Sequence, residues 1–476
     1  MNLSHILYPS ETRRDLNLSI PVAKPCQSVS ALAPGDVYFA SRCENIQDAV
    51  NMGASAIVAD ESAWTDIPLP IPVFPVKNVR RQYALAWSRY TGHPERALRL
   101  IAVTGTNGKT SVTVFLCSLL RALGYKTGLI GTTLCSDGVH TEPSDYTTPP
   151  PEILYPLLAR MKANGATYAV MEASSHALTQ ERLFGLRFAC AIFTNLTRDH
   201  LDYHGTYERY AAAKASLFTM AEHSLLFHSD PSARRMAFDA TGDVFYYGEH
   251  PLAEFEIRDP LISAEGIRYT LVSDGTELPV RLPLYGRFHI ANTAAALACA
   301  IILGEDPSAL ADAIPHMRTP TGRMERLATD TPYAVYLDYA HSPDALTQAL
   351  SSLRPLTRRL TVLFGAGGER DRGKRPQMGR AAAKLADRII LTNDNPRNED
   401  PNRILSDIME GIPDSKAVIC IPDREIAIQY ALDTAQADDI LLFAGKGHEA
   451  YLIDENGKHP FSEREIVRKY LERKGT

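Results

Sequence analysis

Short apolar runs that end in glycines or polar residues recur along the chain and predict buried strands. In the last third such runs occupy residues 334–341, 360–368, 387–397 and 439–449. Helix-like segments, among them 343–353 and 377–385, separate these runs. Strand and helix in alternation are typical of a doubly wound, Rossmann-like sheet, in which ligands bind beyond the carboxyl ends of the strands.

The middle of the chain begins with an apolar run at 98–105, followed by GTNGKT and a helix-like segment at 111–123. In this order, backbone N–H groups and the helix N-terminus can hold phosphate oxygens. Lys109 would neutralise the phosphates, and the Thr110 hydroxyl would hold Mg²⁺. The alternative is a glycine-rich turn with an incidental lysine. Strand-like runs at 168–171 and 189–193 complete a predicted P-loop ATPase-like parallel-sheet domain.

The first hundred residues carry short strand-like runs at 37–40 and 56–59, with a helical stretch at 45–52 between them. They predict a small α/β domain. The whole chain is therefore expected to be an α/β protein of three domains, at 1–96, 97–322 and 323–476.

Composition narrows the function classes. The 476 residues are 45% hydrophobic and 22% charged, which excludes wholesale disorder, and the net charge of −6 offers no global field for a nucleic acid. The seven cysteines are scattered and form no CxxC pair, so neither a disulfide framework nor a zinc knuckle is indicated. No leader and no run of about 18 apolar residues occurs, so we expect a cytoplasmic protein without a membrane span.

Several strand-end and helix residues are candidates for chemistry. Glu172 closes one predicted strand and Asp199-His200 follow another, where a carboxylate could bind Mg²⁺. Lys214 lies in a helical run, where a single lysine is usually a surface residue. Asn292 stands at an N-cap-like position, which is the structural alternative to a ligand contact.

The last domain has two polar segments at predicted strand ends. The stretch 364–376 carries four basic residues after a glycine turn and is either a solvated loop or an anion clamp. Asp394-Asn395-Pro396-Arg397 is either an Asx-Pro turn or a site where the arginine grips a carboxylate.

Taken together, the motifs resemble those of the Mur ligase family over nearly the whole chain. They are GTNGKT at Gly105, TTP at Thr147, EASSHAL at Glu172, FTNLTRDHLDYHGT at Phe193, YAAAKASLF at Tyr210, GRFHIAN at Gly286, GRMERL at Gly322, DYAHSPDAL at Asp338, GERDRGKRPQMG at Gly368, DNPRNEDP at Asp394 and AGKGHE at Ala444. The resemblance implies that ATP phosphorylates a carboxylate of UDP-N-acetylmuramoyl-L-alanyl-D-glutamate. The amine of an amino acid then displaces phosphate, which forms an amide in peptidoglycan precursor synthesis.

The resemblance also implies roles for individual residues. Lys109, Glu172, His200 and Lys214 would be catalytic; Thr110 with Glu172 would bind one Mg²⁺, and His200 with Lys214, as a carbamylated lysine, a second. ATP would contact Gly105, Thr106, Asn107, Gly108, Lys109, Thr110, Ser111, Asn292, Arg323, Asp338 and His341. The UDP substrate would contact Ser28, Ser30, Thr147, Thr148, Ser174 and Arg182, although Ser28-Val29-Ser30 stands where the family commonly has Asp-Ser-Arg.

The incoming amino acid would be meso-diaminopimelate, because DNPR resembles the diaminopimelate form of the family signature. Its contacts would be Arg370, Asp394, Asn395, Arg397, Gly445 and Glu449. The alternatives are the same ligase acting on L-lysine, a ligase like folylpolyglutamate synthetase, or a non-enzymatic ATP-dependent switch or binding module. We expect a monomer whose last domain swings in to close the site.

Overall fold

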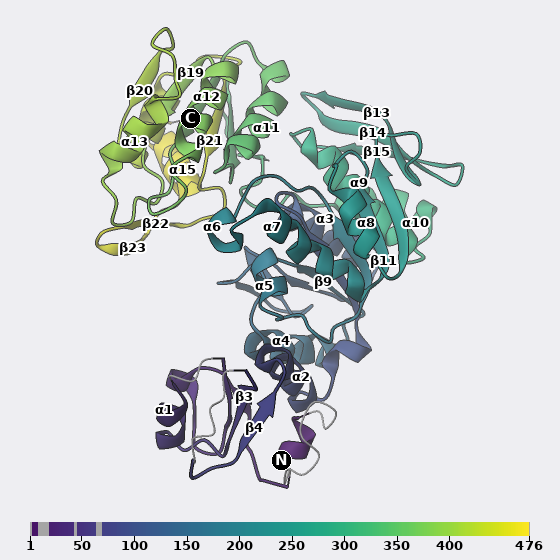
Figure 1. The fold of residues 1–476 in the computed structure, drawn as a ribbon. Helices are drawn as coiled ribbons and strands as arrows, with labels where there is room; N and C mark the ends of the chain where they lie inside the picture. The colour runs from purple at the N-terminus through teal and green to yellow at the C-terminus, as the bar shows by residue number, and fades with distance from the viewer. Residues whose placement is uncertain (1, 8–18, 42–44, 63–68, 476) are drawn as a thin grey trace. The chain divides into compact units, whose positions relative to one another are not determined.

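The computed structural model describes residues 2–7, 19–41, 45–62 and 69–475 (Figure 1). It divides into two compact units, Met1–Tyr246 with Ala298–Glu305 and Tyr247–Leu297 with Asp306–Thr476. The division falls within two elements, strand β12 (Asp243–Gly248) and helix α9 (Phe288–Ile302). Six cysteines in the described part of the chain are free, and Cys43 lies outside the described residues.

The first unit begins with a four-stranded parallel sheet. Its strands, in spatial order, are β1 (Pro25–Cys26), β2 (Val37–Ala40), β3 (Ala56–Asp60) and β4 (Val73–Val76). Helix α2 (Val79–Tyr90) packs on one face through Tyr83, and α1 (Ile46–Asn51) packs on the other through Ala49. Both faces are buried, as expected for a small parallel α/β sheet.

A larger parallel sheet forms the centre of the first unit. Its five parallel strands, in spatial order, are β11 (Ala221–Phe227), β10 (Phe188–Phe193), β5 (Arg99–Thr104), β9 (Tyr168–Glu172) and β6 (Thr127–Ile130). The antiparallel strands β7 (Leu134–Ser136) and β8 (Thr141–Pro143) extend it beyond β6. The helices of this part are α3 (Lys109–Ala122), α4 (Pro151–Ala163), α5 (Ser175–Thr179), α6 (Leu201–His204), α7 (Tyr207–Ala215) and α8 (Ala233–Asp239). Because β10, β5 and β9 are parallel neighbours, their carboxyl ends meet at one edge of the sheet.

The second unit contains an antiparallel meander that the sequence interpretation did not include. It consists of β13 (Phe255–Ser263), β14 (Gly266–Ser273) and β15 (Thr276–Leu282). Asp274 and Gly275 both have positive φ, 47° and 76°, between β14 and β15. An Asp-Gly pair of this geometry forms a tight hairpin turn whose twist matches the strands.

Helix α9 begins at Phe288, four residues before Asn292. The structural alternative for Asn292, an N-cap position, is therefore wrong. The helix starts earlier because the N–H of His289 already bonds to the carbonyl of Gly286, at 2.9 Å. Helix α10 (Pro307–Ala313) follows α9 along the chain.

The last sheet confirms the doubly wound prediction. Its strands, in spatial order, are β16 (Glu325–Arg326), β17 (Ala334–Asp338), β21 (Ile440–Ala444), β18 (Leu360–Phe364), β19 (Arg388–Leu391) and β20 (Val418–Cys420). All its pairings are parallel except that of β16 with β17.

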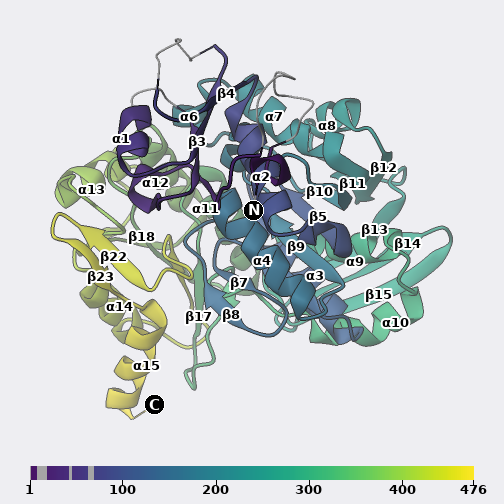
Figure 2. The same ribbon diagram turned by 90° about the horizontal axis from the view of Figure 1, so that it is seen from below.

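Helices cover both faces of this sheet. On one face pack α11 (Pro343–Leu353), α12 (Lys374–Leu385) and α13 (Pro401–Met409), and on the other α14 (Arg424–Asp433) and α15 (Glu463–Lys474). In Figure 2, strand β18 lies between α12 and α13 on one side and α14 and α15 on the other. Along β21, Leu442 packs in the core with α11, α12 and α13, and Leu441 packs in the core with α14 and α15. This alternation is typical of a strand that is buried on both faces. A hairpin, β22 (Tyr451–Asp454) and β23 (Gly457–Pro460), precedes α15.

Among the helices described, none has both the length and the apolar composition that crossing a bilayer would need.

A buried ion pair joins α14 and α15. Arg424 and Glu463 are both buried, and Arg424 Nε donates to Glu463 Oε1 at 2.9 Å. Arg424 also donates to the carbonyls of Asn393 at 3.0 Å and Ala444 at 2.8 Å, so it ties the helices to the ends of β19 and β21.

We predict that Glu463→Gln destabilises the protein by about 3–5 kcal/mol, because it leaves a buried guanidinium without its counter-charge. The measurement is thermal unfolding, with Glu465→Gln on the exposed face of α15 as the control. The double variant Arg424→Met/Glu463→Leu should regain much of the stability. Equal unfolding temperatures for Glu463→Gln and the control would contradict this role.

Candidate active site

The phosphate loop follows β5 and precedes α3, as the sequence predicts. Gly105 has φ +153°, and a Cβ there would lie 1.9 Å from Thr194 Oγ1, so no side chain fits. Gly108, with φ +87°, is the residue before Lys109, the first residue of α3. The loop therefore needs glycine at both positions, and its backbone leads directly into a helix N-terminus, where anions are favoured.

Residues after β10 hold the loop in place, and the sequence interpretation did not single them out. Thr194 Oγ1 donates to the carbonyl of Asn107 at 2.6 Å. The Asn195 amide accepts from the Asn107 N–H at 3.0 Å and donates to the Asn107 carbonyl at 3.1 Å. Thr106 Oγ1 accepts from the Thr197 N–H at 2.9 Å. The only signal in the sequence was that FTNLT is a strand end running into polar residues.

Two lysines converge on the first carbonyl of the loop. Lys109 Nζ donates to the carbonyls of Gly105 and Thr106, both at 2.9 Å. Lys214 Nζ, from α7, donates to the same Gly105 carbonyl at 2.7 Å. Lys214 is only 1% exposed, and burial, with a further contribution from Lys109, holds its pKa well below the usual lysine value. The reading of Lys214 as a surface residue is wrong.

Glu172 closes β9 and is fully buried beside the loop. Its Oε2 accepts from the Thr110 hydroxyl at 3.0 Å. Thr132 donates to the same carboxylate twice, through its N–H at 2.8 Å and its hydroxyl at 3.0 Å. The carboxylate and the Thr110 hydroxyl are therefore adjacent oxygen groups at the start of α3.

His200 lies at the same edge of the sheet, just before α6, with a φ of +52°. Its Nε2 is 3.4 Å from Asp199 Oδ2, and its ring lies 5.0 Å from that of His176. Burial lowers the pKa of His200 to about 4, although Asp199 opposes the shift. At neutral pH the imidazole is therefore uncharged and can act as a ligand.

The predicted UDP-substrate residues of the central sheet are linked to Glu172. Thr147 Oγ1 lies 3.0 Å from the hydroxyl of Thr132, and Thr148 Oγ1 donates to the Glu172 carbonyl at 2.7 Å. The Ser174 N–H donates to Thr148 Oγ1 at 3.0 Å, and Arg182 Nη1 to the Thr148 carbonyl at 2.6 Å. These four residues form one network.

Ser28 and Ser30 follow β1 in the N-terminal sheet, where their hydroxyls are 2.8 Å apart.

In the second unit, Asp338 holds the segment that contains Arg323 in place through backbone hydrogen bonds. Its carboxylate accepts from the N–H groups of Met324 at 2.6 Å and Ala340 at 2.9 Å. Burial raises the pKa of Asp338 to about 6, although Arg323 opposes the shift. The Arg323 guanidinium lies 4.5 Å from the centre of the Tyr339 ring, and His341 Nδ1 is 2.8 Å from the Tyr339 carbonyl. Asn292 is buried within α9 of the same unit.

The predicted amino-acid residues lie after β19 and β21, two strands of the same parallel sheet. Asn395 Nδ2 donates to Glu449 Oε2 at 2.8 Å. A Cβ on Gly445 would lie 2.9 Å from Asp394 Oδ2, so the backbone approaches this carboxylate closely. The structure thus brings the DNPR and AGKGHE motifs together.

Arg397 connects the DNPR segment to the basic loop after β18. It has a φ of +55°, and its Nη1 donates to the carbonyls of Gly368 at 2.8 Å and Asn395 at 3.2 Å. Arg370, on the same loop, is exposed.

The basic loop itself is held by a buried arginine, Arg375, that the sequence interpretation did not assign. Its guanidinium donates to Glu399 at 2.7 and 2.9 Å and to Asp407 at 2.7 Å. Part of this basic segment is therefore structural.

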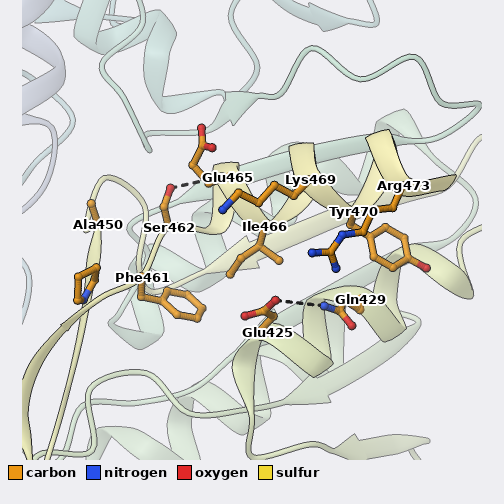
Figure 3. Close-up of a pocket in the computed structure, with 11 residues that line it drawn as sticks. Glu425, Gln429, Ala450, Phe461, Ser462, Glu465, Ile466, Lys469, Tyr470 and Arg473 are labelled. Atoms are coloured by element: carbon orange, nitrogen blue, oxygen red, sulfur yellow. Dashed lines mark hydrogen bonds between the residues drawn. The ribbon is translucent and has the colours of Figure 1, made fainter. Parts of the chain in front are cut away.

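A cavity of about 320 Å³ lies between α14 and α15 (Figure 3), and residues of both helices line it. None of the predicted site residues is among them.

Comparison with known proteins places the chain in a family. A model of the Mur ligase middle domain matches residues 103–300, and one of the Mur ligase glutamate ligase domain matches residues 322–447. The UDP-N-acetylmuramoyl-L-alanyl-D-glutamate--2,6-diaminopimelate ligase of Pseudomonas putida is 40% identical and covers 91% of each chain. The ligase of the same name from Geobacillus kaustophilus is 37% identical, over 93% of this chain and 94% of its own.

Solved structures agree with this assignment. A structure of a ligase of that name is 33% identical, with a TM-score of 0.71 and 97% of each chain covered. Folylpolyglutamate synthase from Mycobacterium tuberculosis, at 21% identity, a TM-score of 0.63, and 76% of this chain and 91% of that one covered, shares the fold. The chain belongs to the Mur ligase family of ATP-dependent ligases.

Proposed function

We propose that the protein joins meso-diaminopimelate to UDP-N-acetylmuramoyl-L-alanyl-D-glutamate at the expense of ATP. A carboxylate oxygen of the dipeptide attacks the γ-phosphorus of ATP, and ADP leaves. The amine of diaminopimelate, having lost a proton, attacks the carbonyl carbon of the acyl phosphate, and inorganic phosphate leaves with that oxygen. The products are the amide, ADP and phosphate.

The convergence of Lys109 and Lys214 on the phosphate loop, next to Thr110 and Glu172, carries this proposal. Both steps gather negative charge on phosphoryl oxygens, which the positive charge of Lys109 stabilises, while Lys214 would act in its carbamylated form. Lys109 changes partners from the Gly105 and Thr106 carbonyls to the phosphates when ATP binds. Thr106, Asn107 and Ser111 contribute through the backbone of the loop and the first turn of α3.

The residues fit one Mg²⁺ through oxygen atoms. Among the described residues, no three His, Cys, Asp or Glu side chains form a metal-binding group. Mg²⁺, however, is usually held by one or two carboxylates with water and substrate phosphates. Thr110 and Glu172, 3.0 Å apart, would hold it, and it would neutralise charge on the phosphates.

A second Mg²⁺ would be held by His200 and a carbamylated Lys214. The uncharged amine is the form of lysine that adds carbon dioxide, and burial favours that form at Lys214. The carbamate turns a nitrogen donor into an oxygen ligand, which suits Mg²⁺. The uncharged imidazole of His200 completes this pair.

The second unit would bind the rest of the substrates. Asn292 would meet adenine, Arg323 the phosphates, and Asp338 with His341 the ribose side of ATP. Arg397 with Arg370 would grip the distal carboxylate of diaminopimelate and Glu449 its ammonium group, next to Asp394 and Gly445. We further propose that the enzyme acts as a cytoplasmic monomer in peptidoglycan precursor synthesis, with domains at 1–96, 97–322 and 323–476.

The direct test measures phosphate release from ATP with each substrate omitted in turn. We expect release only when the UDP-linked dipeptide and meso-diaminopimelate are both present. Release with either one absent would favour an ATP-dependent switch, and release that required folate and glutamate would favour the synthetase alternative.

We predict that Lys109→Ala lowers turnover by at least about 10²-fold, because it removes a preorganised charge from the phosphates. Lys162→Ala, an exposed lysine on α4, is the matched control and should be unaffected. Turnover of Lys109→Ala close to that of the wild type would contradict the assignment of the loop to ATP binding.

We predict that Lys214→Ala is nearly inactive and that short carboxylic acids partly restore its turnover. Formate or acetate would replace the oxygen ligands of the carbamate in the space that the side chain leaves. The assay titrates both acids against the variant and the wild type. An inactive variant that neither acid rescues, with a normal unfolding temperature, would argue against the carbamate.

We predict that Arg397→Ala raises the KM for meso-diaminopimelate strongly and leaves the KM for ATP unchanged. A site built for polar pairing can reject an analogue that lacks the paired group by roughly 10⁴-fold, so L-lysine should be a poor substrate of the wild type. Steady-state kinetics with both amino acids provide the measurement. Equal use of the two amino acids by the wild type would show that the signature does not select diaminopimelate and that Arg397 is only a loop residue.

A further inference from the structure

Lys446, the second residue after β21, has no role in the reaction described above, yet its side chain is 0% exposed. Its Nζ donates to Asn395 Oδ1 at 2.5 Å and to the Tyr451 carbonyl at 2.8 Å. Carboxylate oxygens of Asp394 and Glu449 lie 3.4 and 3.5 Å from it. The lysine therefore contacts three of the residues proposed to bind the amino acid.

Three neighbours fix the orientation of the Asn395 amide. The ammonium of Lys446 and the N–H of Ile453, 2.9 Å away, can only donate, so both must face the amide oxygen. The carboxylate of Glu449 can only accept, so it must face the amide nitrogen. No flipped amide satisfies these three contacts.

This orientation decides what the amide can offer to a substrate. Both lone pairs of Oδ1 are used, by Lys446 and Ile453, and one N–H of Nδ2 is used by Glu449. What remains is a single N–H donor. Such a group matches a carboxylate oxygen and has nothing to accept from an ammonium group.

The charge of Lys446 also acts on the carboxylates. Asp394 and Lys446 are buried and Glu449 is nearly so, and burial lowers the pKa of Lys446 while the carboxylates oppose the shift. The other buried charges of this region, Arg424 and Glu463, pair with each other. Lys446 therefore places a positive charge within 3.5 Å of both carboxylates.

We propose that Lys446 is a positioning residue that sets the specificity of the amino-acid site. It holds the Asn395 amide so that an N–H faces the substrate carboxylate, and it lies 3.5 Å from Glu449, which receives the substrate ammonium. This inference rests on the proposed function, because it needs an amino-acid substrate with a second carboxylate.

The test compares Lys446→Met with the wild type in steady-state kinetics, with meso-diaminopimelate and ATP varied in turn. Without Lys446 the amide loses the charged donor among the three neighbours that fix it, so the KM for meso-diaminopimelate should rise by roughly tenfold or more, with the KM for ATP unchanged. The kcat at saturating substrates should change far less than this KM, which a general loss of structure would not produce.

Lys458→Met is the matched control. Lys458 is exposed on β23, and its Nζ lies 4.1 Å from the centre of the Tyr451 ring, next to the hairpin that Lys446 contacts. It makes no contact with Asn395 in the described structure. We expect wild-type KM and kcat values for this control.

Lys446→Gln separates charge from orientation and serves if Lys446→Met does not fold. Glutamine keeps a donor for Asn395 but carries no charge, so the KM for meso-diaminopimelate should rise less than in Lys446→Met. A folded Met or Gln variant with the wild-type KM for meso-diaminopimelate would overturn the inference. A wild type without activity on meso-diaminopimelate would instead overturn the proposed function, and the inference with it.

Discussion

The carbonyl of Gly105, at the start of the loop between β5 and α3, accepts hydrogen bonds from two lysines, Lys109 and Lys214. Burial, with a further contribution from Lys109, lowers the pKa of Lys214, which favours the uncharged form of its amine at this oxygen. The fold tolerates the arrangement because Thr194 and Asn195 hold the loop from the neighbouring strand.

Strand order explains why distant motifs meet. β9, β5 and β10 are adjacent and parallel, so Glu172, the phosphate loop and His200 reach the same edge from three separate stretches of sequence. The last sheet follows the same principle, because β19 and β21 bring Asn395 and Glu449 within hydrogen-bond distance. Each sheet thus presents charged groups at the ends of its strands, and we propose that one set binds phosphates and the other an amino acid.

The sequence was sufficient for the parts of the fold that depend on local pattern. The strand at 37–40 has the predicted bounds because its continuous apolar run marks burial on both faces. The helix at 343–353 has the predicted bounds because a Ser-Pro pair marks its start. The burial of Lys214 was not visible, since its partner lies 109 residues away in the chain. Lys446 escaped notice for the same reason: its contacts with Asn395 exist only once β19 and β21 are in one sheet. The β13–β15 meander was missed although the Asp274-Gly275 turn is a local signal.

The central claim is that ATP bound at the phosphate loop converts the dipeptide carboxylate into an acyl phosphate. Tracing the oxygen atoms of that carboxylate tests this claim most directly. The dipeptide carboxylate is labelled with ¹⁸O, and the phosphate released during turnover with meso-diaminopimelate is analysed by mass spectrometry. The account predicts that each phosphate carries one oxygen from that carboxylate, because the amine displaces the phosphate together with it. Released phosphate without the label would show that ATP is cleaved by water, and it would contradict the account.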